Sequence, residues 1–109
     1  MANTFKNKTF DGSSTIANSD MIPYTAPSST TTVVIGLTVA NTSNNQITVD
    51  IKLDASTNIF LVKSLPIPAG SSFEYMSGNK IIMQAGHSIK IQSDTANSAD
   101  ICMSIMEIT

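Results

Sequence analysis

The alternation of apolar and polar residues at residues 47–54 is the feature that most constrains the fold. The stretch reads ITVDIKLD, with isoleucine, valine or leucine at every second position and threonine, aspartate or lysine between them. A period of two residues is typical of a β-strand with one buried side and one solvent-facing side. We therefore predict a strand here, with Ile47, Val49, Ile51 and Leu53 facing the core.

A second apolar run precedes this stretch. Residues 31–40 read TTVVIGLTVA, and NTSNNQ separates them from residues 47–54. Asparagine tolerates the left-handed backbone conformations that tight turns need. We therefore predict that the two runs form a β-hairpin, with Val34 on its solvent face. The residues expected on the inward face of its first strand are Val33, Ile35, Leu37 and Val39.

Short apolar runs separated by turn signals continue to the C-terminus. Turns such as PAGS, SGNK and AGH recur about every 8–12 residues, and DTANSAD precedes the last run, ICMSIMEIT. About seven or eight short strands at this spacing are typical of a β-sandwich or barrel. We therefore predict an all-β fold for residues 21–109. The expected architecture is an antiparallel β-sandwich of jelly-roll or immunoglobulin-like type, preceded by an N-terminal arm.

Residues 1–20 differ from the rest because they contain few apolar side chains. Phe5, Phe10 and Ile16 stand among asparagine, lysine, serine and threonine. Burying a phenylalanine contributes about 1.5–3 kcal/mol, whereas ordering one residue of backbone costs about 1–2 kcal/mol. Two phenylalanines therefore do not order an extended arm alone. We predict that residues 1–15 cross onto an adjacent subunit or a larger shell and pair with a strand there. We expect Phe5, Phe10 and Ile16 to be subunit contacts, and the domain to fold without this segment.

The charge composition argues against nucleic-acid binding. The 109 residues include six lysines, no arginine and eight acidic residues, for a net charge of −2. A nucleic-acid site needs a basic patch, and arginine is the preferred donor to phosphate and guanine. No apolar stretch approaches the about 18 residues that span a bilayer, and MANTFKNKTF lacks the apolar segment of a secretory signal. We expect no nucleic-acid or membrane partner, and synthesis in a cytoplasm.

Residues that carry catalytic or metal-binding chemistry are few and scattered. His87 is the only histidine and lies in a turn, and Cys102 is the only cysteine and lies in an apolar run, where we expect it to be buried. Asp50 and Asp54 share one strand face with Lys52 between them, which is typical of a solvated face. A zinc site needs three or four ligands. We therefore predict no catalytic residue, no cofactor, no bound metal and no enzymatic activity.

Two further features have a structural interpretation. Asp94 and Asp100 lie in DTANSAD, which lacks the closely spaced oxygen ligands and the final glutamate of a calcium-binding loop, so we expect an ordinary loop. A carbohydrate-binding module is an alternative, because many are β-sandwiches that stack sugars on aromatic rings. This chain has no tryptophan, and we expect Tyr24 and Tyr75 to be packing residues. The sugar-binding alternative therefore ranks below a structural role.

Five stretches of the sequence carry a resemblance to a known family. They are MANTFKN at the start, TTTVVIGLTVANTS, PIPAGSSF, QAGHSIKIQSDTA, and SIMEIT at the end. Together they resemble small structural proteins in the virions of tailed bacteriophages, of the type common in marine and cyanobacterial phages. The resemblance extends over essentially the whole chain, and its motifs mark strand ends and turns. Members of the family commonly have an acidic residue at the position of His87, so the resemblance gives this histidine no role.

The resemblance implies a non-enzymatic virion component present in many copies. We favour a capsid decoration (cement) protein over the major shell, because such proteins are often small β-domains with arms that reach neighbours. The alternative is a structural β-sandwich of the tail, the neck or a fibre. The implied partners are the major capsid protein or other virion proteins, in a homo-oligomer for which a trimer is favoured. The implied location is the virion, after synthesis in the cytoplasm of the host bacterium.

Overall fold

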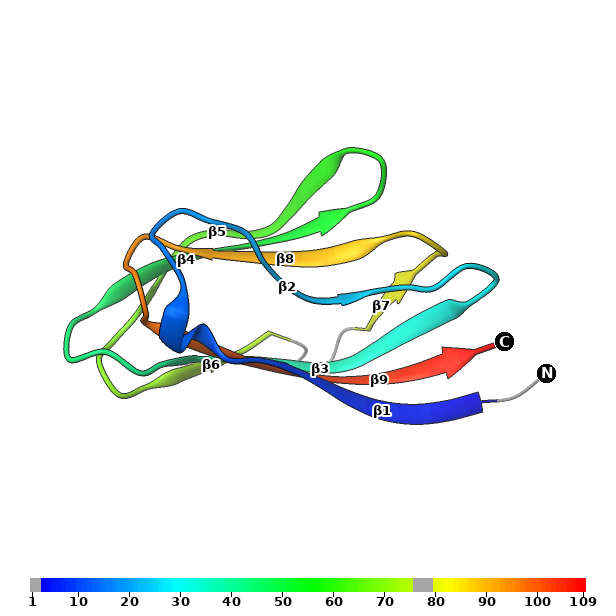
Figure 1. The fold of residues 1–109 in the computed structure, drawn as a ribbon, viewed down its shortest axis with the longest axis horizontal. Coiled ribbons are helices and arrows are strands. Elements are labelled where there is room, and N and C mark those ends of the chain that lie inside the picture. Colours follow the sequence, from blue (N-terminus) through cyan, green and yellow to red (C-terminus); the bar gives the residue numbers. More distant parts are fainter. Residues whose placement is uncertain (1–2, 76–79) are drawn as a thin grey trace.

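A computed structural model describes residues 3–75 and 80–109 and shows two antiparallel β-sheets packed as a sandwich (Figure 1). The described residues form nine strands, one more than the upper end of the predicted range, and the predicted all-β sandwich is confirmed. The elements are β1 (Asn3–Phe10), the 3-10 turn η1 (Gly12–Ser14), β2 (Met21–Thr25), β3 (Thr31–Asn41), β4 (Ile47–Asp54), β5 (Asn58–Ile67), β6 (Ser72–Glu74), β7 (Ile81–Met83), β8 (Ser88–Ser93) and β9 (Ala99–Ile108).

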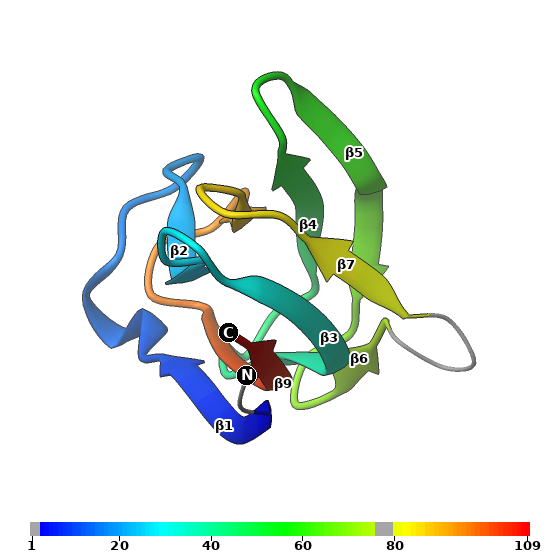
Figure 2. The same ribbon diagram turned by 90° about the vertical axis from the view of Figure 1, so that its right-hand side faces the viewer.

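The two sheets have different memberships. The five-stranded sheet has the order β1-β9-β3-β6, and β7 also pairs with β3. The four-stranded sheet has the order β2-β8-β4-β5. Figure 1 shows the two sheets as two layers, and in both views the β4–β5 hairpin projects beyond the rest of the sandwich (Figure 2). The start of β1 and the end of β9 lie side by side, because Asn3 pairs with Ile108.

The core lies between the sheets and takes alternate residues from each long strand. In β9 every second residue from Ile101 to Glu107 is buried, and in β4 the same holds from Ile47 to Ile51. Removing each of these isoleucines from water contributes about 1.5–3 kcal/mol. The predicted inward positions that the structure confirms are Leu37, Val39, Ile47, Val49 and Ile51, and Leu53 is half-buried.

The predicted hairpin of residues 31–54 is wrong. β3 pairs with β9, β6 and β7, whereas β4 pairs with β5 and β8 in the other sheet. Residues 42–46 carry the chain from one sheet to the other. The side chain of Asn41 organises this crossing, since its buried Nδ2 donates to the carbonyl oxygens of Asn45 (2.8 Å), Ile67 (2.9 Å) and Pro68 (3.1 Å). The two apolar faces therefore meet across the core instead of lying side by side.

The predicted inward positions in the first half of β3 are also wrong. Val34 pairs with Ile105 and Gly36 with Ser104, so Ile35 is the extra residue of a β-bulge. An inserted residue shifts the alternation of the strand by one position. Val34 is consequently buried, Val33 is half-buried on the outer face, and Ile35 is 39% exposed.

The bulge predicts opposite outcomes for two neighbouring valines. Val34→Ala removes two methyl groups from a fully buried site and should lower the free energy of unfolding by about 2 kcal/mol. Val33→Ala, on the half-buried outer face, should cost less than about 1 kcal/mol. Urea unfolding of both variants measures the difference. A larger loss for Val33→Ala would mean that β3 has no bulge at Ile35.

Candidate functional site

The three residues predicted as subunit contacts lie in different surroundings. Phe5, on β1, and Ile16, after η1, are each 72% exposed, whereas Phe10 packs against the core. β1 does not extend away from the domain, because all eight of its residues, Asn3–Phe10, pair antiparallel with β9. The pairing that was expected from a neighbouring subunit is therefore supplied by the same chain, and one edge of β1 is left open.

The segment after β1 is fixed to the start of β9. The amide of Gly12 donates to Asp100 Oδ1 at 2.9 Å, and the amide of Ser13 donates to Asp11 Oδ1 at 2.9 Å. A methyl group on Gly12 would lie 1.6 Å from the carbonyl oxygen of Ala99. Glycine is therefore required at this position by the close approach of two backbone segments.

A largely buried polar cluster joins the two sheets and contacts β1 near its middle. The hydroxyl of Tyr24 on β2 donates to Glu107 Oε2 at 2.6 Å and lies 2.8 Å from Thr32 Oγ1. Lys6 Nζ lies 2.8 Å from Glu107 Oε1. Glu107 continues the inward series of β9, so its charge is stabilised by partners instead of by water.

These contacts shift the pKa of two groups in opposite directions. Hydrogen bonds from Lys6 and from Tyr24 hold the pKa of Glu107 below its ordinary value. Burial and the hydrogen bond to Glu107 raise the pKa of Tyr24 to about 12. The cluster is thus built for an ionised glutamate and a neutral tyrosine.

The cluster predicts a loss of stability at both ends of the pH range. The contribution of Glu107 is present above its unfolded pKa of about 4.3 and is lost as the pH falls through its lower folded pKa. The contribution of Tyr24 is present below about pH 10 and is lost as the pH rises towards about 12, which corresponds to about 2–3 kcal/mol. Urea unfolding between pH 9 and pH 12, compared for the wild type and Tyr24→Phe, measures the alkaline loss.

A matched control is available for the tyrosine prediction. Tyr75→Phe keeps Tyr24 and should show the same alkaline fall as the wild type, whereas Tyr24→Phe should be less stable at pH 7 and fall less between pH 10 and pH 12. Equal alkaline falls in all three proteins would contradict the assignment to Tyr24.

The outer face of the five-stranded sheet carries a row of apolar side chains. Across the sheet Phe5 pairs with Met106, Met106 with Val33, and Val33 with Ile82. Paired residues of antiparallel strands point to the same side, and the neighbours of Met106 in β9 face the core. Phe5 and Ile82 are 72% and 56% exposed. We call these four residues the apolar row.

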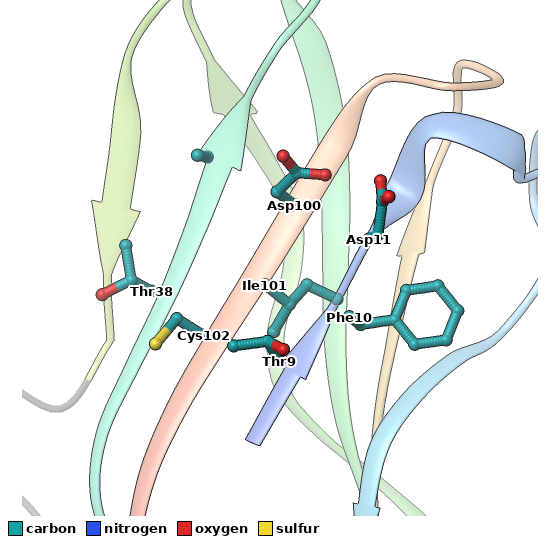
Figure 3. A pocket seen from close by; sticks show the side chains of 8 residues that line it. Thr9, Phe10, Asp11, Thr38, Asp100, Ile101 and Cys102 are labelled. Atoms are coloured by element: carbon teal, nitrogen blue, oxygen red, sulfur yellow. The ribbon is translucent and has the colours of Figure 1, made fainter. Parts of the chain in front are cut away.

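The same face also contains a shallow hollow of about 330 Å³ near the other end of the strands. Thr9, Cys102 and Thr38 occupy one register row beside it (Figure 3). Cys102 is exposed, so its predicted burial is wrong. Its neighbours Ile101 and Met103 take the buried positions of β9, and the alternation turns the thiol outward.

Charges are scarce on this outer face. Among the described residues that the register places there, only Asp100 and Glu74 are charged, one near an end of β9 and one on the short strand β6. Apart from these two carboxylates and the apolar row, the residues that the register places on this face are small or uncharged, for example Asn7, Ser104 and Gly36.

The outer face of the four-stranded sheet is different, because charged residues cover it. Lys52 Nζ lies 3.1 Å from Asp20 Oδ1, and Lys90 Nζ lies 2.9 Å from Asp54 Oδ2. Although burial acts to raise the pKa of Asp20, hydrogen bonds from Gln92 and Lys52 hold it below its ordinary value. These charges confirm the predicted polar face of β4, with Lys52 more buried than expected.

The remaining residues considered from the sequence have structural roles. Tyr24 is buried, and Tyr75 is half-buried with its ring centroid 6.4 Å from that of Phe73, so both are packing residues as predicted. His87 is half-buried after the turn at Ala85–Gly86 and accepts a hydrogen bond from the amide of Gln84.

The two aspartates of DTANSAD accept hydrogen bonds from the protein backbone. Asp94 Oδ1 accepts from the amide of Thr48 at 3.0 Å, and Asp100 Oδ1 accepts from Gly12. Across residues 3–75 and 80–109 no group of three histidine, cysteine or acidic side chains is placed to hold a metal ion. In the same part of the chain no helix is long and apolar enough to cross a membrane.

Comparison with known proteins identifies the fold. No protein-family model matches the chain, and no curated protein matches it. A subunit from the structure of disulfide-linked pili of Bacillus endospore appendages superposes with a TM-score of 0.52 and 16% identity, over 96% of this chain and 85% of that one. A chain of the T13 particle of the virus IBDV superposes with a TM-score of 0.57 and 10% identity, over 96% of this chain and 30% of that one. These likenesses show a jelly-roll-like β-sandwich.

Proposed function

We propose that this chain is a non-enzymatic structural subunit of a bacteriophage virion, bound to the outside of the capsid as a decoration (cement) protein. The observation that carries the proposal is the outer face of the five-stranded sheet, where exposed apolar side chains stand in an almost uncharged surface. Contiguous exposed apolar patches with polar surroundings are typical of protein–protein contact sites.

Three further points support this function. The fold recurs in a virus particle and in a pilus, which are both assembled from many subunits. The sequence motifs resemble those of phage virion proteins along the whole chain. The acidic side chains Asp20, Asp54 and Glu107 are engaged in ion pairs within the domain, so they serve the fold.

The location of the protein on particles tests the proposal. Particles of a phage that encodes this chain are purified on a density gradient and labelled with an antibody against the recombinant protein, followed by gold. We expect label over the whole shell, and many copies per particle by quantitative mass spectrometry. Label confined to the tail, the neck or a fibre would favour that placement instead. Particles free of the protein would overturn a virion function.

A second candidate function is a subunit of a self-assembled surface fibre. The observation that favours it is the extent of the pilus likeness, which covers 85% of that subunit, whereas the likeness to the virus chain covers 30% of its length. Electron microscopy of the purified recombinant protein at high concentration distinguishes the two. Regular fibres formed by this chain alone would favour the pilus-type function, and their absence together with labelled shells would favour the virion.

A further inference from the structure

The apolar row crosses the five-stranded sheet from one edge to the other. It begins with Phe5 on the open edge strand β1 and ends with Ile82 on β7. Met106 and Val33 lie between them on the two central strands and are half-buried. Since neighbouring strands are about 4.8 Å apart, the row is about 14 Å long. It has one apolar residue on each of the four strands that it crosses, so both of its ends present an exposed apolar side chain.

An uncharged surface of this kind is compatible with itself. In a two-fold dimer the same patch occurs on both subunits. A charged residue near the two-fold axis therefore lies close to the same residue of the second copy, which carries the same charge. Like charges in contact cost free energy. The described residues that the register places at the centre of this face are uncharged, and the carboxylate that reaches them is that of Glu74, whose Oε2 would lie 3.5 Å from a methyl group on Gly36. The face of the four-stranded sheet, with Lys52, Lys90, Asp20 and Asp54, does not offer such a surface.

We propose that the outer face of the five-stranded sheet binds the same face of a second copy of this chain. The two-fold axis runs parallel to the strands, between β9 and β3. This axis exchanges β1 with the β6–β7 edge, so Phe5 of one copy faces Ile82 of the other and Met106 faces Val33. The row is thereby matched with itself, residue for residue, across two sheets about 10 Å apart.

The same axis also separates the two carboxylates of this face. The exchange of β1 with β6 puts the backbone of Glu74 opposite Thr9 of the second copy, because the two share a register row. The Glu74 carboxylate reaches to Gly36, which pairs with Ser104 in the register, and is therefore opposite Ser104 of the second copy. Asp100 pairs with Ala40 in the register and faces Ala40 of the second copy. Each carboxylate therefore meets an uncharged side chain.

The size of the face sets the expected strength of the pairing. The face is four strands wide and about eight residues long, with the three-residue strands β6 and β7 sharing the fourth position. It presents roughly 500 Å² per copy, which is below the about 800 Å² per partner of a standard stable interface. We therefore expect a weak dimer in solution, populated at high protein concentration. The inference rests on the proposed structural role for its relevance to assembly, but its test uses the purified protein alone and does not depend on placement in a virion.

Sedimentation velocity of the full chain from about 10 µM to about 1 mM provides the first measurement. We expect a discrete monomer–dimer equilibrium. Ile82→Lys should weaken it at least about tenfold. Ile59→Lys is the matched control, because Ile59 is an isoleucine of similar exposure (52%) on β5 of the other sheet. It should leave the equilibrium unchanged. Circular dichroism of both variants checks that they fold.

Paired substitutions then test the two-fold arrangement. Phe5→Lys and Ile82→Glu should each raise the dissociation constant of the dimer. The double variant should bind at least about tenfold more tightly than expected if the effects of the two single variants were additive. Within one chain these positions lie about 14 Å apart on opposite edges of the sheet, so recovery requires contact between copies. Cys102 of one copy faces Thr38 of the other, which brings the two thiols within reach of a short bismaleimide.

Each outcome decides the proposal. A discrete dimer that Ile82→Lys weakens, Ile59→Lys leaves intact and the bismaleimide joins through Cys102 supports it. A protein that stays monomeric at about 1 mM overturns it, as does a trimer or an open-ended series of oligomers. A dimer broken by Ile59→Lys and not by Ile82→Lys, or one without recovery in the double variant, also overturns it. If the dimer is confirmed while particles carry no label, the virion function fails and the self-association stands.

Discussion

Deletion of residues 1–10 is expected to lower the midpoint of thermal unfolding of the isolated protein by more than about 15 °C, or to abolish a cooperative transition. The deletion removes β1 and leaves one edge of β9, one of the two central strands of its sheet, without a partner. It also removes the packing of Phe10 on the core, worth about 1.5–3 kcal/mol. The ion pair between Glu107 and Lys6, which is 42% exposed, is lost as well and contributes about 1 kcal/mol or less. Differential scanning calorimetry of the shortened protein measures the change.

Two phenylalanines of β1 provide the matched variants for this prediction. Phe10→Ala should lower the free energy of unfolding by about 2 kcal/mol, because Phe10 contacts the core. Phe5→Ala should change it by less than about 0.5 kcal/mol, because Phe5 is largely in water. A shortened protein that unfolds at the same temperature as the full chain would show that residues 1–10 are an independent arm, as the sequence suggests.

The expected arm and the observed strand differ for a physical reason. The free-energy comparison made from the sequence considers side chains only, and by that measure Phe5 and Phe10 do not order ten residues. The backbone hydrogen bonds of an eight-residue pairing with β9 supply the remainder, together with Lys6. Sequence composition identifies the need for a pairing partner but not which chain provides it. The division into an arm at residues 1–20 and a sandwich at residues 21–109 misses this shared sheet.

The alternation of apolar residues predicted the strands and the sandwich but not which strands are neighbours. β3 and β4 each have one apolar face, and this pattern fits both a hairpin and a crossing between sheets. The difference lies in the connection, where the buried side chain of Asn41 binds carbonyl oxygens from the β5 end of the other sheet. This hydrogen bond joins residues that are 26 positions apart in the chain. The residue types in the connection therefore do not predict it.

The alternation of apolar and polar residues in the last strand predicts the observed, outward position of Cys102. Ile101, Met103 and Ile105 are inward, which leaves Cys102 and Ser104 outward. The period of two residues in this strand therefore indicates the position of Cys102 better than the general tendency of cysteine to be buried. In β3 the opposite happened, because the bulge at Ile35 breaks a period that the sequence shows as continuous.

The apolar row depends on the strand register and could not be predicted from the sequence. Phe5, Met106, Val33 and Ile82 are far apart in the chain and become one row only when β1, β9, β3 and β7 are placed side by side. Phe5 alone was identified from the sequence, as an apolar residue in a polar segment. Of its partners in the row, Val33 is expected on the inward face from the sequence alone.

Gly12→Ala is the single substitution expected to be most damaging for its size, with a loss of at least about 3 kcal/mol in the free energy of unfolding. The added methyl group would lie 1.6 Å from the carbonyl oxygen of Ala99, and neither backbone segment has a flexible side chain that could move aside. The turn η1 must then separate from β9, which breaks the hydrogen bond from Gly12 to Asp100. An unpaired, partly buried amide adds to the steric cost.

Gly36→Ala is the matched control for this prediction. Its added methyl group would meet the flexible carboxylate of Glu74 at 3.5 Å and Ser104 Cβ at 4.0 Å, which are both ordinary contacts. We expect a change within about 1 kcal/mol, and alanine also reduces the freedom of the unfolded chain. For Gly12→Ala the midpoint of thermal unfolding should fall by about 10–20 °C. If both variants unfold within about 3 °C of the wild type, η1 does not pack on Ala99, and the anchor that holds the start of the chain to β9 lies elsewhere.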